Sequence, residues 1–398
     1  MSYFNYSCRD VKIVKEQRTG PMKNNKNIPT PYRERIQLLL AELQKRSLSG
    51  ILVFQPENRR YLSGFKPTDP HLHESSGFLI LGKGQAILGT DPRFEGEARK
   101  QARGFYPFIY RRGMESSWPE IESRLKRLRS LAFEGFSVTF HTYKRMKKLL
   151  RSSNKELSFQ PTYQIVETLR ARKENREIKA ITRSLRITEE AFSQVQRALR
   201  PGKTEKQIAW ELKKAVYQKG GEDLAFEPIV ASGPHAALPH AEPTDREIRR
   251  GEPILFDFGS KWQGYCSDLS RTIVLGPPTD RFKEVYALVR RAQYEAEKGI
   301  RAGITSAEAD ALARSVIDKG GYGKFFKHSL GHGVGLATHE LPGISPVKPV
   351  PLAPDMVITI EPGIYLPGWG GVRLENMVVI RKNGNRCLNH DRRFYDFT

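Results

Sequence analysis

Two stretches of the chain, about one hundred residues apart, begin and end alike. RPGKTEKQIAWELKKAVYQKGG starts at Arg200, and RAGITSAEADALARSVIDKGG starts at Arg301. Both carry R-x-G-x-T at the front and V-x-x-K-G-G at the end, and a long segment of helical periodicity precedes each. Because a fixed period indicates internal duplication, the sequence predicts two copies of one helix–helix–strand–hairpin unit, related by a pseudo-twofold axis. Chance similarity between two helix ends rich in Gly and Lys is the alternative.

Each predicted copy ends in a β-hairpin that carries two carboxylates, Asp257 and Asp268 in the first copy and Glu361 and Glu375 in the second. Apolar runs flank turn-forming residues in both segments, which is typical of hairpins. If the first turn centres on Trp262 and Gln263, Asp257 and Asp268 are directly opposed, with Cβ atoms roughly 5 Å apart. Glu361 and Glu375 repeat this arrangement around PGWGG. Like charges in these positions destabilise a hairpin, so we expect a neutralising partner.

A pair of divalent cations is the natural partner for this set of side chains. Four ionised carboxylates in a half-buried site are costly unless their charges are compensated, and two such cations supply four positive charges. His332, between Gly331 and Gly333, adds one imidazole nitrogen. Oxygen ligands with one nitrogen suit Mn, and also Co, Fe or Zn, rather than a thiolate zinc site. Two metals of this kind activate water, so the pattern favours hydrolysis of an amide or an ester.

Further polar residues stand near the predicted ligands: His240 in ALPHAEPTD, His328 and His339 on either side of His332, and Arg373 two residues before Glu375. A strand at residues 373–375 would place Arg373 and Glu375 on one face. Taken singly, each histidine is more often a surface or packed residue, and a lone arginine is more often an ion-pair partner. The residues by themselves leave these alternatives open.

The composition describes a globular protein of a reducing compartment. No run of about 18 apolar residues predicts a membrane span, and the N-terminal sequence lacks the apolar region of a secretory signal. Three cysteines, Cys8, Cys266 and Cys387, are too few and too scattered for a disulfide framework. We therefore expect a cytoplasmic protein with no membrane partner.

The net charge of +22 raises the question of nucleic acid. Residues 111–186 hold 19 Lys or Arg against 8 Asp or Glu, which is half of the excess. Such a footprint attracts nucleic acid or an anionic surface. The basic residues alternate with apolar ones, however, as in RLKRLRSLAF and YKRMKKLL, which is typical of amphipathic helices. We do not expect a nucleic-acid partner.

Three segments follow from the patterning. Residues 1–29 are polar and aperiodic and are predicted to form a flexible basic arm. Residues 30–162 alternate helical and strand patterns, which predicts a smaller α/β domain. Residues 163–398 carry the repeat and the predicted ligands. The fold class is α/β (α+β) with two domains.

The motifs around these residues resemble those of a metallopeptidase family that includes methionine aminopeptidase, Xaa-Pro aminopeptidase (aminopeptidase P), prolidase and creatinase. DFGSKWQGYCSDLSRT resembles the family's Asp-ligand hairpin, HSLGHGVGLATHE its His-ligand loop, and TIEPGIY and GVRLEN the segments with the remaining ligands. The resemblance covers residues 32–392 or thereabouts and implies a duplicated "pita-bread" catalytic domain. ENRRYLSGF and TDPRFEGEA resemble the creatinase-type N-terminal domain, which disfavours methionine aminopeptidase.

The resemblance assigns expected roles to single residues. It implies two metal ions, Mn foremost, held by Asp257, Asp268, His332, Glu361 and Glu375. His240 and His339 fall where the family binds substrate and moves protons, His328 matches an additional active-site histidine, and Arg373 an arginine that supports the site. We take Glu361 as the general base. His235 and Ala241 depart from the family's usual residues, Asn and Gly, and could alter the substrate rim.

The expected function is that of a Xaa-Pro aminopeptidase, which cleaves the bond between an N-terminal residue and a following proline. The proline nitrogen carries no hydrogen and the ring fixes φ, so a shaped pocket can select it. A Xaa-Pro dipeptidase (prolidase) is the close alternative. A non-catalytic binding protein that uses the basic middle segment is the further one. The resemblance also implies a homodimer.

Overall fold

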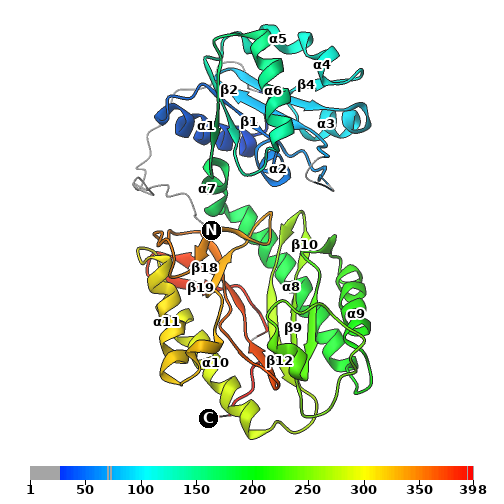
Figure 1. Cartoon of the computed structure of the whole chain (residues 1–398), viewed down its shortest axis with the longest axis vertical. Helices are drawn as coiled ribbons and strands as arrows, with labels where there is room; N and C mark the ends of the chain where they lie inside the picture. Colours follow the sequence, from blue (N-terminus) through cyan, green and yellow to red (C-terminus); the bar gives the residue numbers. More distant parts are fainter. Residues whose placement is uncertain (1–26, 70, 72–73, 392, 398) are drawn as a thin grey trace. The chain divides into compact units, whose positions relative to one another are not determined.

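The architecture is taken from a computed structural model, which describes residues 27–69, 71, 74–391 and 393–397. Of the arm predicted at residues 1–29, positions 1–26 lie outside the described residues. The chain divides into two compact units, the first ending at Leu169 and the second beginning at Arg170 (Figure 1). Each unit combines helices with β-sheet, as the sequence predicts.

The first unit is built on a six-stranded mixed sheet with the order β4-β3-β2-β1-β5-β6. β1 pairs antiparallel with β2 and parallel with β5. The strands are β1 (Gly50–Val53), β2 (Phe78–Gly82), β3 (Gln85–Thr90), β4 (Tyr106–Ile109), β5 (Ser130–Glu134) and β6 (Ser158–Thr162). The helices are α1 (Thr30–Lys45), α2 (Pro56–Ser63), α3 (Glu95–Gln101), α4 (Met114–Ser117), α5 (Pro119–Leu125) and α6 (Phe140–Ser153), with a 3-10 turn η1 (Pro92–Phe94).

Alternation along the strands divides the apolar residues between the two faces of this sheet. One face packs against the apolar sides of α5 and α6, where Met146 and Leu150 are buried. The basic residues of α6 lie on its other side, and Lys144 and Lys148 are exposed. The amphipathic helix predicted at YKRMKKLL is therefore confirmed as α6. The one predicted at RLKRLRSLAF is wrong: α5 ends at Leu125, and the apolar residues Leu131 and Phe133 are buried in strand β5, between β1 and β6.

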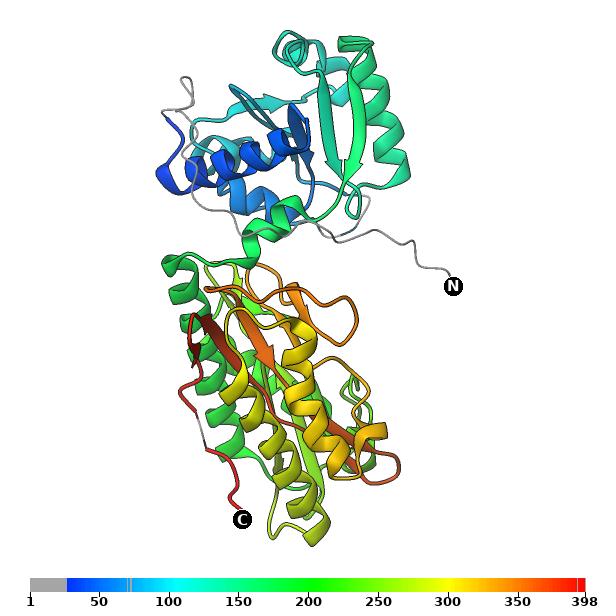
Figure 2. The same cartoon turned by 90° about the vertical axis from the view of Figure 1, so that its left-hand side faces the viewer.

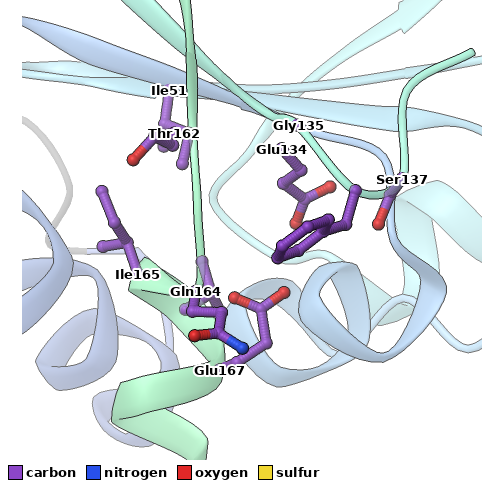
Figure 3. Close-up of a pocket in the computed structure, with 10 residues that line it drawn as sticks. Ile51, Glu134, Gly135, Ser137, Thr162, Gln164, Ile165 and Glu167 are labelled. Atoms are coloured by element: carbon purple, nitrogen blue, oxygen red, sulfur yellow. The ribbon is translucent and has the colours of Figure 1, made fainter. Parts of the chain in front are cut away.

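A small pocket lies in the first unit at the ends of β5 and β6 (Figure 3). The buried carboxylate of Glu134 accepts hydrogen bonds from the backbone N–H groups of Phe54 and Gln55 at 2.7 and 2.8 Å. The side-chain amide of Asn58 donates both to Glu134 and to Glu167, at 2.7 and 2.8 Å. The carboxyl groups of Glu134 and Glu167 thus share one amide group.

The second unit is entered through α7 (Ile165–Ala171) and contains two helix pairs, α8 (Asn175–Ala198) with α9 (Glu205–Gln218) and α10 (Asp280–Gly299) with α11 (Ser306–Lys319). The pairs flank the strands, in green and in yellow in Figure 1, and Figure 2 shows the strands behind α10 and α11. The strands are β7 (Asp223–Leu224), β8 (Ile229–Ser232), β9 (Pro253–Phe258), β10 (Ser260–Trp262), β11 (Tyr265–Cys266), β12 (Leu269–Val274), β13 (Gly331–Gly333), β14 (Glu340–Ile344), β15 (Val357–Ile360), β16 (Gly363–Leu366), β17 (Gly370–Arg373), β18 (Asn376–Arg381) and β19 (Gly384–Cys387). Two 3-10 turns complete it, η2 (Gly233–Ala237) and η3 (Gly323–Phe325).

The predicted duplication is confirmed in detail. Thr204 caps α9 in a capping box with Gln207, and Thr305 caps α11 in the same way with Glu308. The strand order β8-β9-β12 of the first copy corresponds to β13-β15-β18 of the second. The chain before each capped helix makes the same backbone hydrogen bonds, Gly202 N to Ile248 O and Ile248 N to Lys203 O in one copy, and Gly303 N to Leu352 O and Leu352 N to Ile304 O in the other.

The register of the first hairpin differs from the prediction. Trp262 pairs with Tyr265, so the turn residues are Gln263 and Gly264, both with positive φ. Tight hairpins favour such a turn because its twist matches that of the strands, and Gly adopts it without strain. Asp257 is therefore opposite Ser270, not Asp268. The prediction that the two aspartates are directly opposed is wrong, although alternation still leaves them on one face, diagonally placed.

The second hairpin has the predicted register. Ile360 pairs with Asn376 on one side of the carboxylates, and Gly363 pairs with Arg373 on the other. Counting inwards from both pairs places Glu361 opposite Glu375. The chain turns at Pro367, Gly368 and Trp369, between the paired residues Leu366 and Gly370.

Candidate active site

Three carboxylates from three separate segments converge in the second unit. Oxygen atoms of Asp257, Asp268 and Glu375 all lie within 4.8 Å of one another. Asp257 comes from β9, Asp268 directly precedes β12, and Glu375 joins β17 to β18. The backbone N–H of Glu375 donates to Ser270 O at 3.1 Å, so the second hairpin lies directly against the first.

His332 and Glu361 extend the group. His332 Nε2 lies 3.3 Å from Glu361 Oε1 and 3.5 Å from Asp268 Oδ2. Thr359 Oγ1 accepts the backbone N–H of His332 and donates to Glu361 Oε1, each at 3.0 Å. The structure therefore gathers the five residues predicted as metal ligands in one place.

The electrostatics of this group show an excess of negative charge. Burial, with the charges of Glu375, Asp257 and Glu361, raises the pKa of Asp268 well above its ordinary value. Burial and the charges of Glu361 and Asp257 do the same to the pKa of Glu375. Burial acts against ionisation of His332 and Glu361 as well, but their mutual hydrogen bond and attraction raise the pKa of His332 to about 9 and lower that of Glu361 to about 2.

The donor set fits divalent cations. Asp257 Oδ1 and Glu375 Oε1 are buried and have no hydrogen-bond partner among the residues that the structure describes. Buried carboxylate oxygens of this kind require a counter-charge or a proton. Carboxylate oxygens with one imidazole nitrogen are ligands for Mn, Fe, Co or Zn. Cations at the two orphaned oxygens would supply the missing charge.

Arg373 connects the acidic group to a tyrosine. Its guanidinium donates to Asp257 Oδ2 at 2.5 Å, to Ser270 Oγ at 2.8 Å and to the hydroxyl oxygen of Tyr365 at 2.7 Å. His328 Nε2 lies 2.9 Å from the same hydroxyl. Burial raises the pKa of Tyr365 to about 12, although the positive charge of Arg373 acts in the opposite direction. The hydroxyl thus stays protonated and joins Arg373 to His328.

The predicted histidines take different positions around this group. The rings of His332 and His339 are 4.2 Å apart. Burial lowers the pKa of both His328 and His339, and the charge of His332 lowers that of His339 further, so both rings are neutral at pH 7. His240 is exposed, one residue after Pro239, whose carbonyl accepts from Arg373 Nη1 at 3.1 Å. An exposed side chain next to the carbonyl that Arg373 contacts places His240 at the rim.

Sequence reasoning missed three residues of this network, Tyr365, Thr359 and Ser270. A signal existed for two of them. Thr359 and Tyr365 lie two residues before and four residues after Glu361, positions that share its face in an extended hairpin. Ser270 could not be found, because its contact with Arg373 depends on how the two hairpins pack and on the register of the first one.

A duplicated α/β unit with a buried carboxylate and imidazole cluster, preceded by a separate α/β unit, defines a metal-dependent hydrolase. Residues 179–382 match the model of metallopeptidase family M24, and residues 35–172 match that of the creatinase/prolidase N-terminal domain. The chain therefore belongs to metallopeptidase family M24 and is a peptidase. The predicted family, fold class and enzyme class are confirmed.

Relatives with a stated activity match nearly the whole length of this chain. A Xaa-Pro dipeptidase of Pyrococcus horikoshii is 34% identical over 360 residues, which is 90% of this chain and 98% of the relative. The solved Xaa-Pro dipeptidase from Bacillus anthracis has a TM-score of 0.83 at 35% identity and covers 90% of this chain and 98% of its own. The X-Pro aminopeptidase from Thermotoga maritima has a TM-score of 0.80 at 33% identity, with coverage of 89% and 97%.

Among the helices of the described residues, none combines the length and the apolar character needed to cross a bilayer.

Proposed function

We propose that this protein is a Xaa-Pro dipeptidase, which hydrolyses the bond between an N-terminal residue and a C-terminal proline. The observation that carries the proposal is the convergence of Asp257, Asp268 and Glu375 within 4.8 Å, with two orphaned oxygens, in a metallopeptidase fold. The aminopeptidase was the first expectation from the sequence. Relatives named as Xaa-Pro dipeptidases, matched over 90% of the chain, favour the alternative.

The proposed ligands of two divalent cations are Asp257, Asp268, His332, Glu361 and Glu375. Mn is our first choice, with Co, Zn or Fe as the alternatives, because these ions accept this mixture of oxygen and nitrogen. When bound, such a pair polarises the carbonyl of the scissile bond and makes water a stronger nucleophile. The remaining groups of the site then serve to move protons and hold the substrate.

Glu361 is the proposed general base. In the protein without metal, the hydrogen bond and attraction between Glu361 and His332 lower the pKa of Glu361 to about 2 against the effect of burial, so its carboxylate is ionised. It accepts a proton from the attacking water, and a proton reaches the proline nitrogen as the C–N bond breaks. The two products together account for the water, since the acid product gains its hydroxyl and the amine product gains its hydrogen.

His339 and His240 are the proposed substrate contacts. A neutral imidazole can donate one N–H, and His339 is neutral at pH 7 because burial and the charge of His332 lower its pKa. Donation to the scissile carbonyl oxygen would strengthen as negative charge develops there. His328 and Arg373 are the proposed supporting residues: both contact the hydroxyl of Tyr365, and Arg373 also donates to the carbonyl of Pro239, next to His240.

A paired assay tests the proposal. The protein, loaded with Mn, is given a Xaa-Pro dipeptide and a Xaa-Pro tripeptide with the same first residue. We expect kcat/KM for the dipeptide to exceed that for the tripeptide at least tenfold. A preference for the tripeptide would replace the proposal with the second candidate, a Xaa-Pro aminopeptidase, which the likeness to the X-Pro aminopeptidase from Thermotoga maritima supports.

The non-catalytic binding protein considered from the sequence loses support, because the predicted ligands are intact and assembled in a metallopeptidase fold. Less than about one metal per chain after Mn supplementation would restore it. We further propose that the protein is cytoplasmic and that it forms a homodimer. Analytical ultracentrifugation tests the homodimer.

A further inference from the structure

Three charged side chains outside the carboxylate cluster are buried together in the second unit. Arg170, Lys173 and Glu340 expose 3%, 1% and 4% of their side chains. Arg170 Nη2 donates to Glu340 Oε1, and Lys173 Nζ lies 3.3 Å from Glu340 Oε2. Burial by itself disfavours the ionised form of Glu340. The positive charges of Arg170 and Lys173 nevertheless lower its pKa to about 2, so the carboxylate stays ionised.

Stability alone does not account for this arrangement. Removing charges from water costs about as much as their attraction returns, so a buried ion pair is seldom more stabilising than a packed apolar pair. The use of such a group is more often to specify one conformation, and this is a hypothesis to be tested in each protein. The role of this group is therefore to be sought in the segment that Glu340 contacts, and not in the strength of its ion pairs with Arg170 and Lys173.

That segment is the loop at residues 335–340. Glu340 Oε1 accepts the backbone N–H of Ala337 at 2.9 Å. The N–H of Gly335 donates to Ala337 O at 3.0 Å, and a Cβ at Gly335 would lie 2.6 Å from Glu340 Oε2. The carboxylate thus occupies the space inside the loop, where position 335 has room for no side chain.

The same loop carries His339 to the active site. Pairing between β13 and β14 is interrupted after His332, so that Gly333 pairs with Glu340 while His332 pairs with Gly343. This irregularity folds the loop back over the strand and brings the His339 ring to 4.2 Å from the His332 ring. Glu340 is the next residue in the chain, so any shift of its backbone moves His339.

We propose that Glu340 is a positioning residue for His339: the buried contacts of its carboxylate with Arg170, Lys173 and the N–H of Ala337 hold the loop that sets the His339 imidazole against the site. The inference rests on the proposed function only in giving His339 a role toward substrate. An aspartate at position 340 keeps the charge but is shorter by one methylene, and cannot reach all three partners from the same backbone position.

The first test is kinetic. In the Mn-loaded full chain, Glu340→Asp should lower kcat/KM for a Xaa-Pro dipeptide about 10- to 100-fold, since a displacement of about 1 Å has effects of that order. In a His339→Ala background, Glu340→Asp should lower kcat/KM less than about twofold, because the residue through which it acts is gone. Equal losses in the two backgrounds, or no loss in either, would overturn the inference.

The second test does not depend on activity. In metal-free protein, Glu340→Asp should speed hydrogen exchange of the Ala337 amide at least about tenfold, because that amide loses its acceptor. Unchanged exchange at Ala337 would refute the positioning role even in a protein that fails to hydrolyse any Xaa-Pro peptide. Absence of hydrolysis by the unmodified, metal-loaded protein would instead remove the proposed function.

Two further variants serve as a matched control and as a replacement for Glu340→Asp. Glu189→Gln alters another buried glutamate of the same unit, one that accepts the backbone N–H groups of His390 and Asp391. It should leave kcat/KM and the exchange of Ala337 within about twofold of the unmodified protein, as expected for a change away from the loop. If Glu340→Asp does not fold, Arg170→Lys keeps the charge and removes the guanidinium, and the same cycle with His339→Ala applies.

Discussion

At the scale of single residues, the site is a charge-balance problem, and Asp268 lies at its centre. Its carboxylate is buried, and its pKa is raised by burial and by three neighbouring carboxylates. An amide of the same size removes one negative charge and one ligand. We expect Asp268→Asn to reduce activity more than about 10³-fold and to weaken metal binding, because a ligand and its charge are lost together.

Metal-free Asp268→Asn should unfold at the same urea concentration as the metal-free parent or at a higher one, since repulsion among the carboxylates is relieved. Metal analysis, activity and urea unfolding together check this prediction. A variant that retains its activity would show that Asp268 is not part of the site.

Tyr365 provides a second prediction at this scale. Its hydroxyl accepts from Arg373 and lies 2.9 Å from His328 Nε2. Tyr365→Phe leaves both groups without this partner, which costs about 1–2 kcal/mol of stability. We expect kcat/KM to fall about tenfold with metal content unchanged, because the hydroxyl supports Arg373 and His328 but is not itself a ligand.

The matched control for Tyr365→Phe is Tyr143→Phe in the first unit, whose hydroxyl contacts Lys147. It should change neither activity nor metal content. Loss of metal in Tyr365→Phe would contradict the assignment, because it would make the hydroxyl part of the metal site.

At the scale of secondary-structure elements, the turn between β10 and β11 decides the register of the first hairpin. Gln263 has a φ of 49° and Gly264 a φ of 74°. Asn adopts the left-handed region with less strain than Gln, and Asn-Gly is the preferred sequence for such turns. Gln263→Asn should therefore raise the free energy of unfolding by about 0.5 kcal/mol with activity unchanged.

Urea unfolding of metal-free protein measures this change, and Gln263→Val, which suits the turn poorly, should lower the midpoint. An increase in stability with valine would argue against the left-handed turn.

The end of β5 provides a prediction about pH. Burial raises the pKa of Glu134 from 4.5 to about 7, against the effect of the hydrogen bonds from Asn58 and Gln55. The folded unit holds this proton up to about pH 7, whereas the unfolded chain releases it near pH 4.5. The contribution to stability is therefore complete below pH 4.5 and is lost as the pH rises to 7, by about 3 kcal/mol in all.

Urea unfolding between pH 5 and 8, followed through hydrogen exchange in β1 and β5, measures this loss. Glu134→Gln, which cannot ionise, should remove the dependence. A midpoint for the first unit that rises from pH 5 to pH 7 would contradict the prediction.

At the scale of the whole molecule, two compact units should respond differently to metal. The proposed ligands all lie in the second unit, after Arg170. A ligand that binds only the folded state stabilises it by mass action. We expect removal of metal by a chelator to lower the stability of the second unit by several kcal/mol and to leave the first unchanged, because a hundredfold excess over Kd is worth about 2.7 kcal/mol.

Unfolding monitored by hydrogen exchange separates the two responses, with Asp268→Asn as the control that should respond to metal less than the parent. A first unit that loses as much stability as the second would contradict the placement of the site.

The strong positive charge also belongs to this scale. In the basic stretch, α6 buries Met146, Leu149 and Leu150 and directs Lys144 and Lys148 to solvent. This is the ordinary arrangement of an amphipathic helix, so part of the excess charge is a solvated surface. Surface charge of this kind does not by itself specify a partner.

The sequence by itself determined most of the elements of the second unit and predicted a site on its two hairpins. The repeat predicted two helix pairs with two hairpins, because capping residues such as Thr204 and Thr305 and the apolar periodicity act locally. The same local patterns located the five proposed ligands, since excess negative charge on two hairpins has few physical explanations.

Tertiary structure alone decided the contact of Ser270 with Arg373 and the burial of Glu340 between Arg170 and Lys173. The register of Asp257 was set instead by the turn at Gln263 and Gly264, both with positive φ, a local signal that the prediction misplaced by one residue. The contacts of Ser270 and Glu340 join residues about 100 and 170 positions apart. Their energies arise only after the backbone has placed those groups together, away from water, and a local pattern in the chain carries no trace of that placement.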